Sequence, residues 1–419
     1  EAPAELYTDD ILESAKDTTA IVVLSRDSSE ASDYSTNMKD PNGDSFDTPM
    51  SISAYEKEMI QLAKENSNGK VIVLINSDVP MEIQELKDDP EIGAILWTGL
   101  PGMNGFLGVC DVLSGDVNPS GHISDTYVTS SVSAPAMTNF GLYTYTNASN
   151  AESGAELTEA DKGDWYVVET EGIYIGYKYY ETRYEDTVLG NGNADSIVGS
   201  STGKAWNYND EIAYPFGYGL SYTTFSQTLD GVEYDETTDT YNVKVTVTNT
   251  GDTAGKSVAE VYAQTPYGDY EKENNVEKSA VQVVGFDKTD ILAPGASETL
   301  EIPVERYLLA SYDYTNAKGY ILSEGDYYFA IGDDAHDALN NILAAKGAKG
   351  MTDALGEKAK GDAEKAYSWN NAKLDTESYK MSRYSDMEVT NQFDDANLNN
   401  LGTDTVTYLS RSDWEGTYP

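Results

Sequence analysis

The segment from Lys70 to Tyr127 constrains the fold more than any other part of the chain. Val71 to Ile75 is a short apolar run rich in β-branched residues, which is typical of a strand covered on both faces of a parallel sheet. A helical pattern follows and ends before Pro90, because proline disfavours helix in the residue that precedes it. Ile92 to Thr98 is a second buried strand pattern. Strand, helix and strand in this order predict an open α/β sheet.

The residues that follow these two strands indicate where a ligand would bind. Asn76-Ser77 follows the first strand, and the loop from Gly99 to Gly105 follows the second. In open α/β sheets ligands bind at the carboxyl ends of the strands, so both segments are expected at the ligand-binding edge of the sheet. The loop lacks the GxGxxG spacing of a dinucleotide site, and no acidic ribose partner follows at the right distance. Nucleotide binding is therefore excluded.

An earlier strand, Thr19 to Leu24, belongs to the same α/β domain and follows a short helical pattern. A long polar loop comes next, and a helix is expected from about Ser51 to Glu65, with Ser53 as its cap. A polar loop at the carboxyl end of a strand is a functional position in this architecture. Because few strands precede Tyr127, we expect an incomplete sheet whose open edge needs another polypeptide.

Charge and cysteine content limit the partners and the location of the chain. The 72 acidic and 27 basic residues give a formal net charge of -45, which excludes nucleic acid as a default partner. We expect an exported protein, extracellular or on the cell surface of a bacterium. No segment is long and apolar enough to span a membrane, and Glu1-Ala2-Pro3 lacks the features of a signal peptide. The single cysteine, Cys110, excludes an internal disulfide and is predicted to pack in the core.

The pattern becomes all-β from about residue 226 to 335. The run from Tyr241 to Gln264 alternates and breaks at Asn249, which indicates either a hairpin or a Greek-key corner. About seven short strands over roughly 100 residues predict a β-sandwich. After residue 335 the composition predicts one or two helices, interrupted by Gly347 and Gly350, and then a polar tail with little core of its own.

Long ordered motifs give the chain a resemblance to a known family. "NSDVPMEI", "DDPEIGAILWTGLPGMNG" and "DVLSGDVNPSGHISDTY" resemble the second, α/β-sandwich domain of family 3 glycoside hydrolases. "EGIYIGYKYYET" and "YPFGYGLSYTTF" resemble the family's connection to a fibronectin-type-III-like domain. The resemblance implies a partial α/β-sandwich domain over 1–225 and the fibronectin-like domain over 226–335. Residues 336–419 would then be a linker tail toward a missing (β/α)8 barrel, as in members with reversed domain order.

The same resemblance implies that Glu30, in the polar loop after Leu24, is the catalytic acid/base. Such a residue hands its proton to the leaving glycosidic oxygen. Arg26 and Asp33 flank it and are expected to contact the substrate; the charge of Asp33 would raise the pKa of Glu30 and that of Arg26 would lower it. Without the resemblance, the alternative interpretation is a solvated acidic loop.

Two other features have a catalytic and a structural interpretation. Asp413-Trp414 mimics the family's barrel nucleophile motif, but only one strand-like run precedes it. We therefore expect Asp413 to lie far from Glu30, bound as a strap against the sandwich. Tyr174 and the tyrosines that follow it are expected to pack structurally rather than to stack on sugars.

These features together predict one part of a retaining, β-glucosidase-like enzyme. The chain would supply the acid/base, a barrel polypeptide would supply the nucleophile, and the chain alone would be inactive. The alternative is a non-catalytic exported scaffold or glycan-binding module that retains the fold. The expected substrate is an oligosaccharide or glycoside, no cofactor or metal is expected, and self-association into a homo-oligomer is left open.

Overall fold

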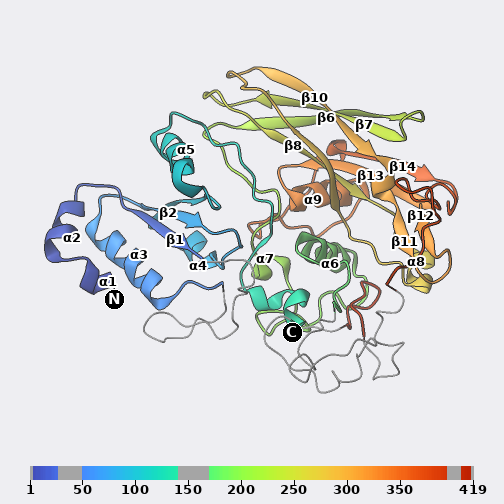
Figure 1. Cartoon of the computed structure of the whole chain (residues 1–419), viewed down its shortest axis with the longest axis horizontal. Helices are drawn as coiled ribbons and strands as arrows, with labels where there is room; N and C mark the ends of the chain where they lie inside the picture. The colour runs from blue at the N-terminus through green and yellow to red at the C-terminus, as the bar shows by residue number, and fades with distance from the viewer. Residues whose placement is uncertain (1–2, 27–49, 140–168, 394–406, 417–419) are drawn as a thin grey trace.

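The computed structural model describes residues 3–26, 50–139, 169–393 and 407–416. It consists of an α/β part, blue in Figure 1, followed by a β-sandwich, as the sequence predicts. Two helices, α6 (Tyr177–Leu189) and α9 (Ala335–Ala345), pack against each other beside the sandwich (Figure 1).

The α/β part has a parallel sheet whose strands are, in spatial order, β1 (Ile21–Ser25), β2 (Val71–Asn76) and β3 (Ile92–Trp97). These predicted strands are confirmed, and within the described residues the sheet holds these three alone. The prediction that Ile92 to Thr98 is a buried strand is wrong, because no residue of β3 is buried. β1 is buried on one face only. Val22 and Leu24 are buried, whereas Ile21 and Val23 on the other face are 48% and 42% exposed. Among the described residues this face of β1 is left partly exposed. The expected need for another polypeptide at an edge of the sheet stays a prediction.

The helix predicted between the first two strands is α3 (Ala54–Asn66), and its cap is confirmed. The hydroxyl of Ser53 accepts from the backbone N–H of Glu56, whose carboxylate accepts from the backbone N–H of Ser53. This reciprocal pair satisfies two N–H groups that a helix start otherwise leaves without partners. The shorter helices of this part are α1 (Pro3–Leu6), α2 (Asp9–Ala15) and α4 (Gln84–Asp88).

Helix α5 (Gly102–Ser114) follows β3 and ends at Gly115, which has the left-handed φ of +82° typical of a helix C-terminus. The prediction that Cys110 packs in the core is wrong, because the thiol is exposed and no residue of α5 is buried. Met103 and Leu107 are 98% and 70% exposed. The periodicity identified an apolar face, but it does not say whether another element covers that face.

The sandwich has two antiparallel sheets. One consists of β6 (Phe225–Asp235), β7 (Thr240–Asn249) and β10 (Ser297–Glu305). The other consists of β8 (Val258–Gln264), β9 (Gln282–Lys288), β13 (Gly325–Gly332) and β14 (Ala366–Asn371). A short hairpin, β11 (Ser311–Asp313) and β12 (Gly319–Ile321), and helix α8 (Asp269–Asn274) lie at its side.

The break at Asn249 is a corner between sheets and not a hairpin, because β7 and β8 lie in different sheets. The Asn249 side chain is fully buried and donates to the carbonyls of Thr253 and Leu292, both at 2.8 Å. An amide that replaces ladder hydrogen bonds in this way lets the chain cross from one sheet to the other without leaving buried polar groups unpaired.

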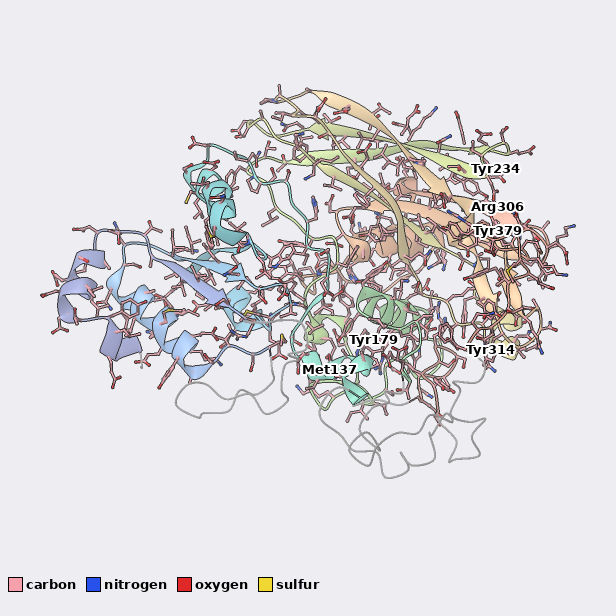
Figure 2. The ribbon with its side chains drawn as sticks, viewed as in Figure 1. Met137, Tyr179, Tyr234, Arg306, Tyr314 and Tyr379 are labelled. Atoms are coloured by element: carbon pink, nitrogen blue, oxygen red, sulfur yellow. The ribbon has the colours of Figure 1, made fainter. Side chains whose placement is uncertain are left out.

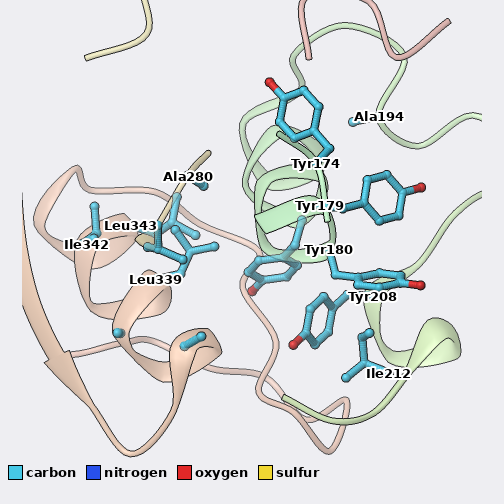
Figure 3. Packing of buried hydrophobic residues seen from close by; sticks show 14 of the residues in the cluster. Tyr174, Tyr179, Tyr180, Ala194, Tyr208, Ile212, Ala280, Leu339, Ile342 and Leu343 are labelled. Atoms are coloured by element: carbon cyan, nitrogen blue, oxygen red, sulfur yellow. The ribbon is translucent and has the colours of Figure 1, made fainter. Parts of the chain in front are cut away.

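One buried core contains the aromatic side chains on and around α6 and the aliphatic side chains of α9 (Figure 3). Tyr174, Tyr179 and Tyr180 are at most 1% exposed, so the predicted packing role of these tyrosines is confirmed. The same core contains Trp206 and, from β8, Tyr262. One core therefore continues across residue 225, and the domain division there remains a sequence prediction. Helix α7 (Tyr208–Glu211) and the paired strands β4 (Tyr127–Val128) and β5 (Ile212–Tyr214) complete this region.

Residues after 335 contribute more core than the composition predicts. Helix α9 is largely buried, and β14 pairs with β13 as the outer strand of the second sheet. Further along, the hydroxyl of Tyr379 donates to Asp239 at 2.6 Å, and Arg306 lies 3.5 Å from the same carboxylate (Figure 2). These contacts attach a polar segment to the sandwich through side chains and not through a hydrophobic face of its own.

Candidate active site

The carboxyl ends of β1, β2 and β3 meet at one edge of the parallel sheet. The register places Ser25 beside Asn76, and Ile75 beside Trp97. The segments predicted to face a ligand therefore do lie along a common edge. This is the edge at which open α/β sheets bind ligands.

Arg26 follows β1 directly and is held by helix α3. Its guanidinium donates to the two carboxylate oxygens of Glu56 at 2.6 and 3.1 Å and to the carbonyl of Ser51 at 2.5 Å. The side chain is buried, and bidentate pairs of this kind are among the stronger charge-assisted contacts. Because Glu56 also closes the capping box with Ser53, a single carboxylate joins the end of β1 to the start of α3.

Trp97 brings an aromatic ring to the same edge. Its indole N–H donates to the carbonyl of Ser77 at 2.8 Å, and the side chain is 38% exposed. Ser77 is fully buried, so the indole is anchored to a fixed part of the backbone. Gly99 has a φ of +59°, and a Cβ added there would lie 3.6 Å from the ring of Trp97. An anchored, half-exposed ring offers an apolar face for stacking beside polar groups.

Two of the three predicted site residues, Glu30 and Asp33, lie outside the described residues. Their catalytic and substrate-binding roles stay predictions, as does substrate contact by Arg26. Sequence reasoning missed the role of Glu56 and the position of Trp97. The spacing of Ser53 and Glu56 is the signal of a capping box, but no local pattern indicates that Glu56 also binds Arg26.

The segment that contains Asp413 crosses helix α6 as a strap, which we define as residues 407–416. Arg411 pairs with Asp186 at 2.6 Å and Glu185 at 3.1 Å, and the indole N–H of Trp414 donates to Asp186 at 3.0 Å. Burial alone would lower the pKa of Arg411, but the charges of Asp186 and Glu185 raise it above its ordinary range. Asp413 itself is exposed and caps its own turn. A strap is present, but it lies mainly on α6 and not against a sandwich sheet as predicted. That Asp413 lies far from Glu30 stays a prediction, because Glu30 is outside the described residues.

Two further findings concern the described part of the chain. Its titratable side chains include no group of three or more that is arranged to hold a metal ion. None of its helices combines the length and the apolar composition that crossing a bilayer requires.

Comparison with known protein families shows to which family this chain belongs. Residues 5–222 match the glycosyl hydrolase family 3 C-terminal domain, and residues 257–335 match the fibronectin type III-like domain. The chain belongs to glycosyl hydrolase family 3. The first match spans the parallel sheet, its carboxyl edge and helix α6, and the second spans much of the sandwich.

Family 3 proteins similar to this chain are named as β-glucosidases. Beta-glucosidase A of Butyrivibrio fibrisolvens is 30% identical over 68% of the chain, and a β-glucosidase of Ruminococcus albus is 28% identical over 68%. The chain spans 30% and 24% of the lengths of these two relatives. Among solved structures, a β-glucosidase from Paenibacillus barengoltzii is 26% identical with a TM-score of 0.60, and the match covers 88% of this chain and 32% of that one.

Proposed function

We infer that this chain supplies the acid/base portion of a retaining, β-glucosidase-like glycoside hydrolase. Family 3 membership and the names of the relatives support the reaction class. The observation that carries the assignment is the pair of Arg26 and Glu56, which fixes the chain on both sides of residues 27–49 at the ligand-binding edge. Chain length alone keeps the Cα of Glu30 within about 14 Å of that of Arg26.

In this proposal Glu30 acts twice. As a carboxylic acid it protonates the glycosidic oxygen while a nucleophile attacks the anomeric carbon, and as a carboxylate it then activates the water that releases the sugar. Retention requires the two carboxyl groups to lie about 5–5.5 Å apart. The nucleophile would come from a barrel polypeptide outside this sequence, and the chain by itself would be inactive. The Trp97 ring at the edge would contact the sugar or its leaving group.

The test is Glu30→Gln in the assembled enzyme. Loss of general-acid help should lower turnover of a disaccharide by roughly 10²- to 10⁴-fold. The loss should be much smaller for an aryl glucoside whose leaving group needs no proton. Glu65→Gln, an exposed carboxylate on α3, is the matched control and should leave turnover unchanged. Undiminished cleavage of the disaccharide by Glu30→Gln would move the role to another carboxylate, with Asp33 the next to test.

The requirement for a barrel has a separate test. Intact-mass and N-terminal analysis of the native material should find barrel sequence either on the same polypeptide or in a tightly bound second chain. Full β-glucosidase activity of the isolated chain would contradict the proposal. A native protein without any barrel would favour a non-catalytic module that retains the fold.

A further inference from the structure

A cavity of about 500 Å³ lies where the end of the α/β part meets the sandwich and helix α9, and none of the described residues of the carboxyl edge lines it. Its walls come from segments distant in sequence, including residues 120–122, 218–227, 333–340 and 353–361. The volume is within the range of small-molecule sites, which is about 300–1,000 Å³. Arg26, the one predicted site residue within the described part of the chain, does not line this cavity.

One wall of the cavity is rigid because two chain segments are paired. The backbone N–H of Ile123 donates to the carbonyl of Tyr218 at 2.9 Å, and that of Gly217 donates back to Ile123 at 3.0 Å. Gly219 lies so close to the opposite segment that an added Cβ would be 2.4 Å from the carbonyl of Gly121. The wall that carries His122 and Tyr218 is therefore preformed, which lowers the entropic cost of binding a ligand.

Asp334 forms another part of the lining and is only 7% exposed. It is the N-cap of α9, and its Oδ1 accepts from the backbone N–H of Asp337 at 2.8 Å. Among the described residues no group donates to its Oδ2, and because Asp334 lines the cavity this oxygen is available to a ligand. Burial raises the pKa of Asp334 to about 7. A carboxyl oxygen that lines the cavity and has no protein donor can accept a hydrogen bond from a ligand hydroxyl.

His122 and Tyr218 add the other kinds of contact. Burial, together with the charge of Lys288, lowers the pKa of His122, so its ring is neutral near pH 7. The Nδ1 atom of this ring is buried and has no hydrogen-bond partner among the described residues. A neutral imidazole offers one donor and one acceptor. Tyr218 is half-buried in the lining and adds an aromatic surface.

The charges of the lining exclude one class of ligand. The lining has more carboxyl groups than cations. Its acidic side chains are Asp333, Asp334, Asp337 and Asp353, and its cationic side chains are Lys256 and His336. An anion such as phosphate would be repelled. A neutral polyhydroxylated molecule fits better, because each hydroxyl donates to a carboxylate and accepts from an amine or imidazole, and its apolar face covers a tyrosine ring. We propose that this cavity binds a neutral saccharide at a site separate from the carboxyl edge.

The test is calorimetric titration of the full chain with glucose and with cellobiose. Asp334→Asn is the decisive variant, because asparagine caps a helix as well as aspartate does and the fold of α9 is retained. At about pH 8, above the pKa of Asp334, the variant lacks the charged acceptor of the wild type, so affinity should fall about tenfold or more. Tyr218→Ala should weaken binding as well. Asp235→Asn, the same change at the half-buried last residue of β6 and outside the lining, should bind like the wild type.

Three outcomes would overturn the proposal. The first is an absence of saccharide binding to the wild-type chain, and the second is unchanged affinity in Asp334→Asn. The third is binding of spermidine or inorganic phosphate in place of the sugars. The proposal does not depend on Glu30 being the acid/base, so a Glu30→Gln chain should bind saccharide in this cavity with unchanged affinity.

Discussion

The imidazole of His336 lies 2.9 Å from the carboxylate of Glu181, and both side chains are 1% exposed. Its Nδ1 contacts Glu181 and its Nε2 contacts the carbonyl of Thr352, also at 2.9 Å. Because both partners accept hydrogen bonds, the ring carries a proton on each nitrogen and is cationic. The ring of Tyr208 stacks on it with 4.0 Å between centroids, so α6, α7 and α9 meet around one buried ion pair.

Stability should therefore fall as pH rises past the pKa of His336. Burial alone would lower this pKa, but the charge of Glu181 and the hydrogen bond to it outweigh burial and hold the pKa above 6.5. The folded chain binds this proton more tightly than the unfolded chain. The contribution of the ion pair is then complete below pH 6.5 and is lost as pH rises through the folded-state pKa. Urea unfolding of the wild type and His336→Gln from about pH 5 to about pH 9 measures this difference.

His122 is the matched control, because the chain has two histidines. Burial lowers the pKa of His122, so its linkage has the opposite sign and stability is lost as pH falls below 6.5. A stability difference between wild type and His336→Gln that stays constant across the whole pH range would contradict a charged His336.

Arg411→Leu should destabilise the chain strongly. The substitution leaves Glu185 and Asp186 buried without the guanidinium that pairs with both, and removing one partner of a buried ion pair costs about 3–5 kcal/mol. Arg383→Leu is the control, because Arg383 and its partner Glu305 are 36% and 53% exposed, and solvent screens such a pair. Similar urea midpoints for the two variants would show that the strap contributes little.

Glu56→Ala should lower stability more than Ser53→Ala does. Loss of the Ser53 cap alone costs about 1 kcal/mol. Glu56→Ala removes the carboxylate half of the capping box and also leaves the buried guanidinium of Arg26 without the Glu56 carboxylate. If that pair positions the catalytic loop, Glu56→Ala in the assembled enzyme should lower kcat more than it changes KM. Unfolding in urea and steady-state kinetics measure the two effects. Equal stability losses in both variants would refute a separate role for the ion pair.

Cys110 should react in the native chain with a thiol reagent such as DTNB at a rate close to that of the urea-unfolded chain. The thiol lies on α5, where no residue is buried. Absorbance after mixing gives both rates. Strong protection in the isolated chain would contradict the exposure of α5, and protection that appears only when a barrel polypeptide is added would place the contact with that polypeptide near this helix.

Local patterns were sufficient to predict the strands of the parallel sheet and the start of α3. An apolar β-branched run such as Val71 to Ile75 determines a strand within a few residues, and the capping box at Ser53 spans a single helical turn. The order of the motifs was sufficient for the fold class. The position of Glu30 after the first strand also came from sequence, and its role rests on the resemblance.

Contacts between distant segments could not be predicted from sequence. Arg411 and Asp186 are 225 positions apart. Charged residues are normally expected at the surface, so nothing indicated that α6 buries three carboxylates. The tyrosines of "EGIYIGYKYYET" alternate loosely and did not reveal the helix that begins at Tyr177. For Cys110 the sequence identified an apolar helix face, but burial depends on a neighbour that periodicity does not describe.

The strap also affects folding during translation, because it is synthesised long after the helix that it covers. Trp414 donates to Asp186 across 228 positions, so at roughly 5–20 residues per second the ribosome adds Trp414 about ten to fifty seconds after α6. During that interval Asp186 lacks its ion pair with Arg411, and the ring of Tyr174 lacks its contact with Trp414. The aromatic side chains around α6 are therefore accessible to chaperones and proteases until the strap is made. A chain truncated before Arg411 would keep them accessible, and we expect it to be degraded.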